Sequence, residues 1–133
     1  MWIVLPAGHH LAGRDSLAIA DLAGERWVHG CLSTGDTLDH YAALAGFEVR
    51  TACRGTDYVF AQSLVRAAVG ISMIPQVALT ADQGGLVTIP LEPPCPSRFV
   101  GIATPRRRPN PLSDAMLRAL QDTVAGLPLP SLQ

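Results

Sequence analysis

Short apolar blocks recur along the first half of the chain, and each ends at a proline, a glycine or a polar residue. The blocks lie at residues 2–5, 26–30, 47–53 and 71–74. Runs of this length are short for helices and typical of strands. We therefore predict four strands in this half of the chain.

Between the second and third blocks the apolar spacing becomes helical. The residues that recur at i, i+3, i+4 and i+7 are Leu38, Tyr41, Ala42 and Ala45. This spacing places them on one face of a helix. We expect the helix to begin near Ser33 or Thr34 and to be closed by Gly46 as the glycine after its last turn.

A second helical stretch lies between the third and fourth blocks. We expect it to open at Thr56 or Asp57 and to end at Gly70. Its apolar face consists of Phe60, Leu64 and Ala67. The resulting order of strand, helix, strand, helix and strand is the pattern of a parallel α/β layer.

The pattern changes after residue 85. Two further strands are expected at residues 86–91 and 98–103, with a proline-rich connection between them. A final helix is predicted over residues 112–124, with Ser113 as a plausible N-cap.

Composition narrows the class of protein. The chain has 133 residues, of which 48% are hydrophobic and 16% charged, and its formal net charge is −1. A domain that binds nucleic acid usually carries a basic excess, so the charge argues against that function. The basic run at residues 106–108 lies between prolines and is interpreted as a solvated loop.

Location follows from the same kind of argument. No segment approaches the roughly 20 apolar residues of a membrane helix, and the N-terminus lacks the basic start of a secretion signal. The three cysteines, Cys31, Cys53 and Cys95, form no CxxC pair, so a reducing compartment is the simplest interpretation. We expect a cytoplasmic protein that does not contact a membrane.

Candidate chemistry is concentrated at residues 29–40, which read HGCLSTGDTLDH. One hypothesis is nucleophilic catalysis by Cys31 or Ser33. The spacing G-x-x-S-x-G differs from the nucleophile elbow G-x-S-x-G. His29 could activate Cys31, but no third group in the sequence supports the pair. We therefore expect no catalytic residue.

A metal site is a second hypothesis for the same stretch. Asp36 and His40 stand at i and i+4 on the expected helix, with Cys31 or His29 as further ligands. One helical pair is weak support, and Asp36 is better explained by the helix dipole. A separate pair at residues 9–10, His-His, lies in a loop with no acidic residue nearby in sequence. We therefore expect no metal and no cofactor.

The third hypothesis is a ligand-binding helix N-terminus. The stretch joins the end of a strand to the start of a helix, where ligands bind in open α/β sheets. Ser33 and Thr34 add hydroxyls, and Gly35 lets a ligand approach the backbone. A carboxylate or another small anion suits the unpaired N–H groups there. A capping box of Ser33 and Asp36 without any ligand is the alternative.

A family resemblance favours the ligand hypothesis. Residues 3–28, IVLPAGHHLAGRDSLAIADLAGERWV, followed by AGFEVR and LVRAAVGISMIP, resemble the effector-binding region of LysR-type transcriptional regulators. The resemblance covers about residues 1–124. Three positions depart from the family pattern: His10 and Val49 stand where proline is common, and Ala68 replaces a glycine.

The resemblance implies an α/β, periplasmic-binding-protein-like (type 2) fold of two subdomains around a cleft. Residues 1–85 would form one α/β subdomain with its entry strand, and residues 86–133 the return strands and C-terminal helix of an incomplete second one. The effector contacts implied by the family fall on Leu32, Ser33 and Thr34. A weaker correspondence places Thr56 and Asp57 near the cleft.

The implied function is effector sensing. By the resemblance, a small anionic metabolite would bind here and control DNA binding by an N-terminal helix-turn-helix, which a chain truncated in this way would lack. An alternative is a small-molecule solute-binding protein unrelated to DNA. The return strands would lack part of their sheet, and unpaired edges favour association. We therefore expect a homo-oligomer, formed through the strands at residues 86–103 or the helix at residues 113–124.

Overall fold

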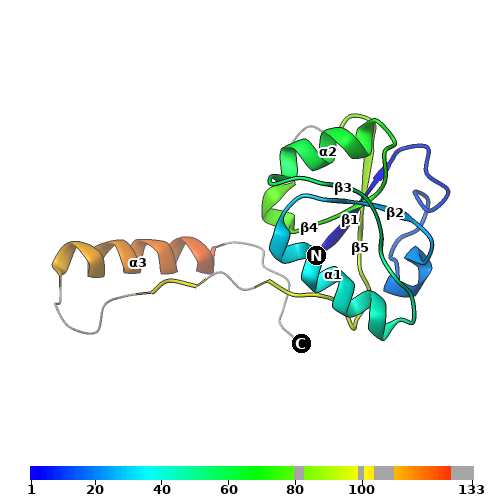
Figure 1. Ribbon diagram of the computed structural model, residues 1–133. Coiled ribbons are helices and arrows are strands. Elements are labelled where there is room, and N and C mark those ends of the chain that lie inside the picture. The colour runs from blue at the N-terminus through cyan, green and yellow to red at the C-terminus, as the bar shows by residue number, and fades with distance from the viewer. Residues whose placement is uncertain (80–82, 99–100, 104–109, 127–133) are drawn as a thin grey trace. The chain divides into compact units, whose positions relative to one another are not determined.

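The computed structural model describes residues 1–79, 83–98, 101–103 and 110–126 (Figure 1). The chain divides into two compact units, Met1–Arg98 and Phe99–Gln133, which are described separately. The first unit contains strands β1 (Trp2–Pro6), β2 (Arg26–His29), β3 (Arg50–Arg54), β4 (Ser72–Ile74) and β5 (Leu86–Pro90), and helices α1 (Leu32–Leu44) and α2 (Tyr58–Arg66). The second contains α3 (Pro111–Ala125).

The strands of the first unit form a mixed sheet. β1 lies between β4 and β5 and is antiparallel to both, while β2 and β3 pair in parallel. An isolated parallel bridge between Trp27 and Ile71 joins the two groups. In this bridge the Ile71 N–H donates to the Arg26 carbonyl at 2.7 Å, and the Val28 N–H donates to the Ile71 carbonyl at 2.8 Å. The strand order across the unit is therefore β3-β2-β4-β1-β5.

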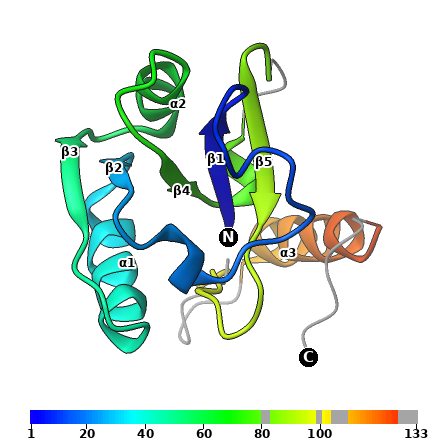
Figure 2. The same cartoon turned by 90° about the vertical axis from the view of Figure 1, so that its right-hand side faces the viewer.

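Helices α1 and α2 cover opposite faces of this sheet (Figure 2). Alternation along β1 explains why, because successive side chains of a strand point to opposite faces. Ile3 belongs to the larger core cluster, which includes Leu38 of α1. Val4 belongs to the smaller cluster, which includes Val65 of α2. The predicted α/β layer is confirmed, and its parallel part is β2-α1-β3-α2-β4.

The start of α1 differs from the prediction. The helix begins at Leu32, and Cys31 is its N-cap, without a side-chain capping bond. Ser33 is therefore already inside the first turn, and the predicted capping box of Ser33 and Asp36 is wrong. The end agrees with the prediction. Gly46 has φ +84°, a left-handed conformation that favours glycine.

The predicted start of α2 agrees with the structure, and the predicted end does not. Asp57 is the N-cap, as predicted, and its carboxylate accepts a hydrogen bond from the Phe60 N–H at 2.7 Å. The helix ends at Arg66, before the expected Gly70. Its buried face is Ala61, Gln62 and Val65. The predicted face was wrong because Phe60 projects into solvent, 49% exposed.

The C-terminal predictions have mixed outcomes. β5 is confirmed, and it pairs along its length with β1. Part of the strand predicted at residues 98–103 and the basic run at 106–108 lie outside the described residues, and residues 101–103 are not a strand. The N-cap of α3 is Asn110, which accepts from the Leu112 N–H at 3.0 Å, rather than Ser113. The subdomain boundary at residue 85 stays a prediction.

Among the described helices, none combines the length and apolar content that crossing a membrane requires.

Candidate anion-binding site

A small cavity of about 130 Å³ opens at the N-terminal end of α1. Three segments far apart in sequence form it: the N-terminal residue, the first turns of α1 and the chain after β5. The lining residues are Met1, Thr34, Thr37, Pro96, Ser97 and Arg98. The cavity therefore combines hydroxyl groups, one guanidinium and a helix N-terminus.

Thr34 is the sequence-predicted site residue that lines this cavity. It is 5% exposed, and its hydroxyl donates to the Cys31 carbonyl at 2.7 Å. This bond fixes the side chain against the first turn of α1. The first N–H groups of any α-helix have no partner within the helix, and the dipole is positive there. The backbone at residues 32 and 33 therefore favours an anion.

Arg98 connects this cavity to the start of α2. Its Nη1 donates to the Tyr58 hydroxyl at 3.1 Å, and Tyr58 is the first residue of α2. Burial raises the pKa of Tyr58, while a hydrogen bond with Thr34 and the charge of Arg98 lower it in part. Tyr58 is therefore a neutral phenol at neutral pH that joins the beginnings of the two helices.

His29, the last residue of β2, lies behind the first turn of α1. Its Nε2 is 3.0 Å from the Thr51 hydroxyl, and its side chain is buried. Burial and the nearby Arg54 lower the pKa of His29, and Asp39 opposes this shift. A Cβ on Gly35 would lie 3.2 Å from Nδ1. His29 is thus a neutral, packed imidazole bonded to Thr51.

The other predicted site residues have different positions. Leu32 and Ser33 lie in the first turn of α1, but their side chains are outside the described part of the structure. Thr56 is exposed and Asp57 caps α2, and neither lines the cavity.

Sequence reasoning missed several residues of the cavity. Thr37 could have been found, since it follows Thr34 by three residues and shares its helix face. Nothing in the local sequence connects Ser97 or Arg98 with α1, because they reach it only through the fold.

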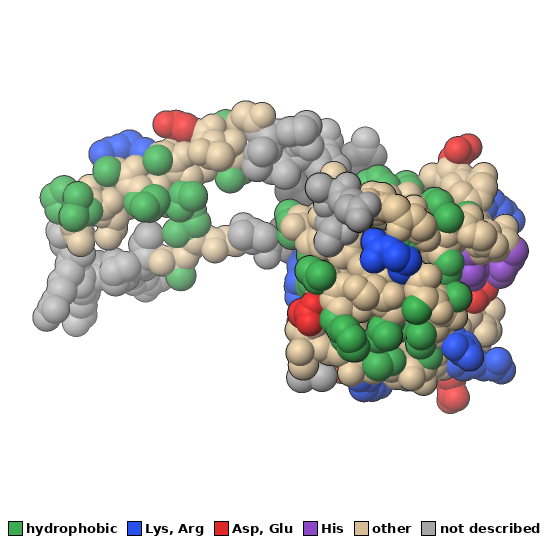
Figure 3. Space-filling model, turned by 90° about the horizontal axis from the view of Figure 1, so that it is seen from above, with side chains coloured by type: hydrophobic (Ala, Val, Ile, Leu, Met, Phe, Trp, Pro, Cys, Tyr) green, Lys and Arg blue, Asp and Glu red, His purple; other side chains and the backbone are tan. Residues whose placement is uncertain are grey.

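The sequence offered two candidate groups of metal ligands, and the structure gives a different outcome for each. Asp36 and His40 are both exposed, and no third ligand joins them among the described residues. For the pair His9 and His10, the expectation that no acidic partner lies nearby was wrong. The Glu25 carboxylate is 3.3 Å from His9 Nε2 and 3.6 Å from His10 Nε2. Histidine side chains gather at one edge of the face in Figure 3.

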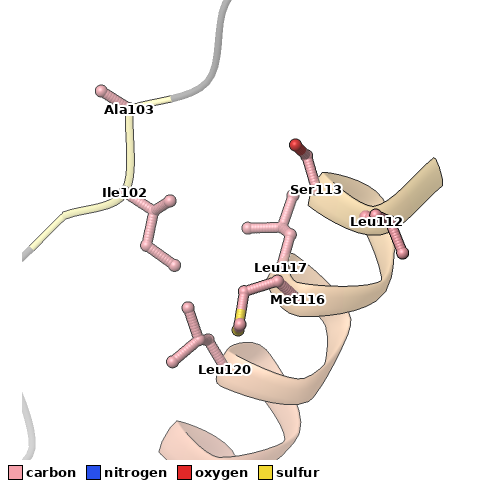
Figure 4. Close-up of a pocket in the computed structure, with 7 residues that line it drawn as sticks. All are labelled: Ile102, Ala103, Leu112, Ser113, Met116, Leu117 and Leu120. Atoms are coloured by element: carbon pink, nitrogen blue, oxygen red, sulfur yellow. The ribbon is translucent and has the colours of Figure 1, made fainter. Parts of the chain in front are cut away.

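The second unit has a groove that is apolar, unlike the polar cavity at the start of α1. About 380 Å³ in volume, it lies between residues 102–103 and one face of α3 (Figure 4). Ile102, Met116 and Leu120 point toward one another across it. The lining is apolar except for Ser113 and offers no charge to an anion.

The polar cavity lies where β2 leads into α1, the kind of strand-to-helix junction at which open α/β sheets bind ligands. The LysR substrate binding domain family matches residues 1–125, so the chain belongs to this family. Effector-binding domains of this family are regulatory and not catalytic. Membership also favours the regulator over the alternative of a solute-binding protein unrelated to DNA.

Individual known proteins that are similar to this chain agree with the family assignment. The uncharacterized HTH-type transcriptional regulator YybE of Bacillus subtilis (strain 168) is 29% identical over 107 residues, which are 77% of this chain and 36% of the relative. The effector-binding domain of QuiR in complex with shikimate superimposes with a TM-score of 0.76 at 20% identity, covering 95% of this chain and 62% of that one.

The Synechocystis PCC6803 CcmR regulatory domain in complex with 2-PG has a TM-score of 0.77 at 15% identity. The superposition covers 96% of this chain and 64% of that domain. The chain thus spans less than two thirds of each of these proteins, and the two structural likenesses show the fold.

Proposed function

We propose that this domain binds a small carboxylate or similar anion at the N-terminus of α1 and that binding controls a helix-turn-helix DNA-binding domain. The similar domains of QuiR and CcmR are complexes with shikimate and 2-PG, both small anionic metabolites. YybE is an HTH-type regulator, which supports the link to DNA.

The observation that carries this proposal is the position of Arg98 in the cavity with Thr34 and the start of α1. A guanidinium binds a carboxylate through charge-assisted hydrogen bonds, which are about twice as strong as neutral ones. The N–H groups of Leu32 and Ser33 supply further donors, while the hydroxyl of Thr34 is held by the Cys31 carbonyl and lines the cavity. Thr56 and Asp57 would act at the edge of the site, through the start of α2.

The size of the cavity indicates that it is one wall of a larger site. Its 130 Å³ is well below the roughly 300–1,000 Å³ of typical ligand pockets. We propose that the opposite wall belongs to the part of the QuiR and CcmR folds that this chain does not cover. Binding by this chain alone would then be weak, and the test must detect weak binding.

Heteronuclear NMR titration of the chain with shikimate, and then with other small carboxylates, is such a test. We expect chemical-shift changes centred on the backbone amides of residues 31–37, 97 and 98. Arg98→Gln should weaken binding about tenfold or more, because a hydrogen bond to a charged group contributes about 1.5–3 kcal/mol. Arg50→Gln is the matched control, since Arg50 is exposed at the start of β3.

The control variant should bind like the wild type. Shift changes located elsewhere, or equal affinities of the Arg98→Gln variant and the wild type, would remove this cavity from the effector site. Loss of binding in both variants would show that general charge, not the site, attracts the ligand.

A further inference from the structure

We propose that His9, His10 and Glu25 form a binding site for a divalent late transition metal, with Zn²⁺ as the representative ion. A group of three histidine, cysteine or acidic side chains that lie close together could hold a metal ion. Among the described residues, His9, His10 and Glu25 form such a group. Their candidate ligand atoms all lie within 4.8 Å of one another.

Each histidine nitrogen lies at about the tetrahedral ligand–ligand distance from one of the two Glu25 oxygens. With metal–ligand bonds of about 2.0–2.2 Å, two ligand atoms of a tetrahedral zinc site lie about 3.4 Å apart. The observed separations are 3.3 Å from His9 Nε2 to Glu25 Oε2 and 3.6 Å from His10 Nε2 to Glu25 Oε1. The imidazole rings have centroids 4.5 Å apart and are inclined by 30°, so both face the same carboxylate. Small side-chain adjustments would complete the site.

Burial makes two of the three ligands well ordered. The side chains of His9 and Glu25 are 15% and 20% exposed, while that of His10 is 68% exposed. The nearby guanidinium of Arg26 does not occupy the carboxylate, because its Nε and Nη2 donate to the Val69 carbonyl. Glu25 is therefore available to balance the charge of a cation.

The hydrogen bonds that His9 makes without a metal ion show which bonds must change when an ion binds. The Leu11 N–H donates to His9 Nδ1 at 3.3 Å, so a neutral His9 carries its hydrogen on Nε2 and donates it to Glu25. A metal ion at Nε2 replaces that hydrogen, which moves to Nδ1. The long bond from Leu11 is then lost, and the carboxylate changes from acceptor to metal ligand.

Three protein ligands leave a coordination position open, as in catalytic and exchangeable zinc sites. A second cavity of about 200 Å³ adjoins the cluster and is lined by His9, Glu25, Arg26 and Gly70, among others. It has room for water or a small anion as the fourth ligand. Bound metal would join the loop after β1 to the residue before β2. This site lies at the start of β2, and the proposed effector pocket lies beyond its end.

Zinc titration of the full chain, followed by calorimetry, tests the proposal. We expect binding of one Zn²⁺ per chain, weakened about tenfold or more by His10→Ala and by Glu25→Gln. His10 is exposed, so its replacement leaves the core intact. His40→Ala is the matched control, because His40 is an exposed histidine outside the cluster, and it should bind like the wild type.

Cysteine is the competing ligand, since none of Cys31, Cys53 and Cys95 forms a disulfide. Titration with Co²⁺ separates the two possibilities, because thiolate ligands add intense charge-transfer absorption that imidazole and carboxylate ligands lack. We expect a spectrum without this absorption. No saturable binding, thiolate absorption, or equal affinities of the wild type, His10→Ala and Glu25→Gln would overturn the assignment.

Discussion

Ala68 adopts a backbone conformation that suits glycine. Its φ is +56°, in the left-handed region, directly after the C-cap of α2. An L side chain in this region costs roughly 1–2 kcal/mol, whereas glycine adopts it freely. The sequence resemblance expects glycine here, and the structure gives the physical reason.

Ala68→Gly should therefore stabilise the chain by about 1 kcal/mol. Glycine removes the backbone strain of the folded state, and this gain exceeds the loss of stability caused by the greater conformational entropy of the unfolded chain. Urea denaturation followed by circular dichroism measures this difference. Ala67→Gly is the control: Ala67 has φ −80°, so glycine there should destabilise by about 0.5–1 kcal/mol. If both variants are destabilised alike, Ala68 is not strained.

The candidate site shows how far single residues can be predicted. Thr34 was identified because its neighbours in sequence mark a strand-to-helix junction. Arg98 and Glu25 were missed because they reach Thr34 and His9 only through strand pairing and loop closure. Local patterns therefore point to single residues of each site, and the way the residues come together depends on tertiary structure.

Among the elements, the junction between the two strand groups depends on one glycine. A Cβ on Gly70 would lie 2.4 Å from the Arg26 carbonyl oxygen, closer than real Cβ atoms approach. That oxygen accepts the Ile71 N–H in the bridge between β2 and the start of β4. A backbone atom cannot move aside as a flexible side chain would, so the strands themselves would have to separate.

Gly70→Ala should consequently destabilise the chain by about 2 kcal/mol, within the usual range for overpacking. Thermal and urea unfolding of the variant measure this loss. Gly13→Ala is the matched control, because a Cβ there meets nothing within 4 Å. A Gly70→Ala variant as stable as the control would mean that the bridge can be opened at little cost.

Element types were more predictable than element ends. The alternation from β2 to β4 follows from period and length in the sequence. The start of α1 was missed because the Cys31 side chain makes no capping hydrogen bond, so no typical capping residue marks it. The buried face of α2 was missed because Phe60 looks like a core residue but projects outward, and the core instead takes Ala61 and Val65.

At the scale of the whole molecule, the family pattern predicted the α/β class, because the order of its elements is specific even where each motif is weak. The sequence also predicts association through the strands at residues 86–103 or the helix at residues 113–124, and α3 carries an exposed apolar face. Leu112, Met116, Leu120 and Val124 recur every fourth residue along it, with exposures of 79%, 62%, 41% and 48%. Such a continuous apolar stripe is typical of a helix that packs against a partner.

We expect a second copy of the chain to be that partner, with the α3 stripes packed together in a symmetric dimer. Leu120→Glu should shift the population to monomer, because a charge in the centre of the stripe must be desolvated on association. Light scattering over a concentration series measures the change. Ala115→Glu adds the same charge away from the stripe and should stay dimeric. A monomeric wild type at all concentrations would show that another partner covers this face.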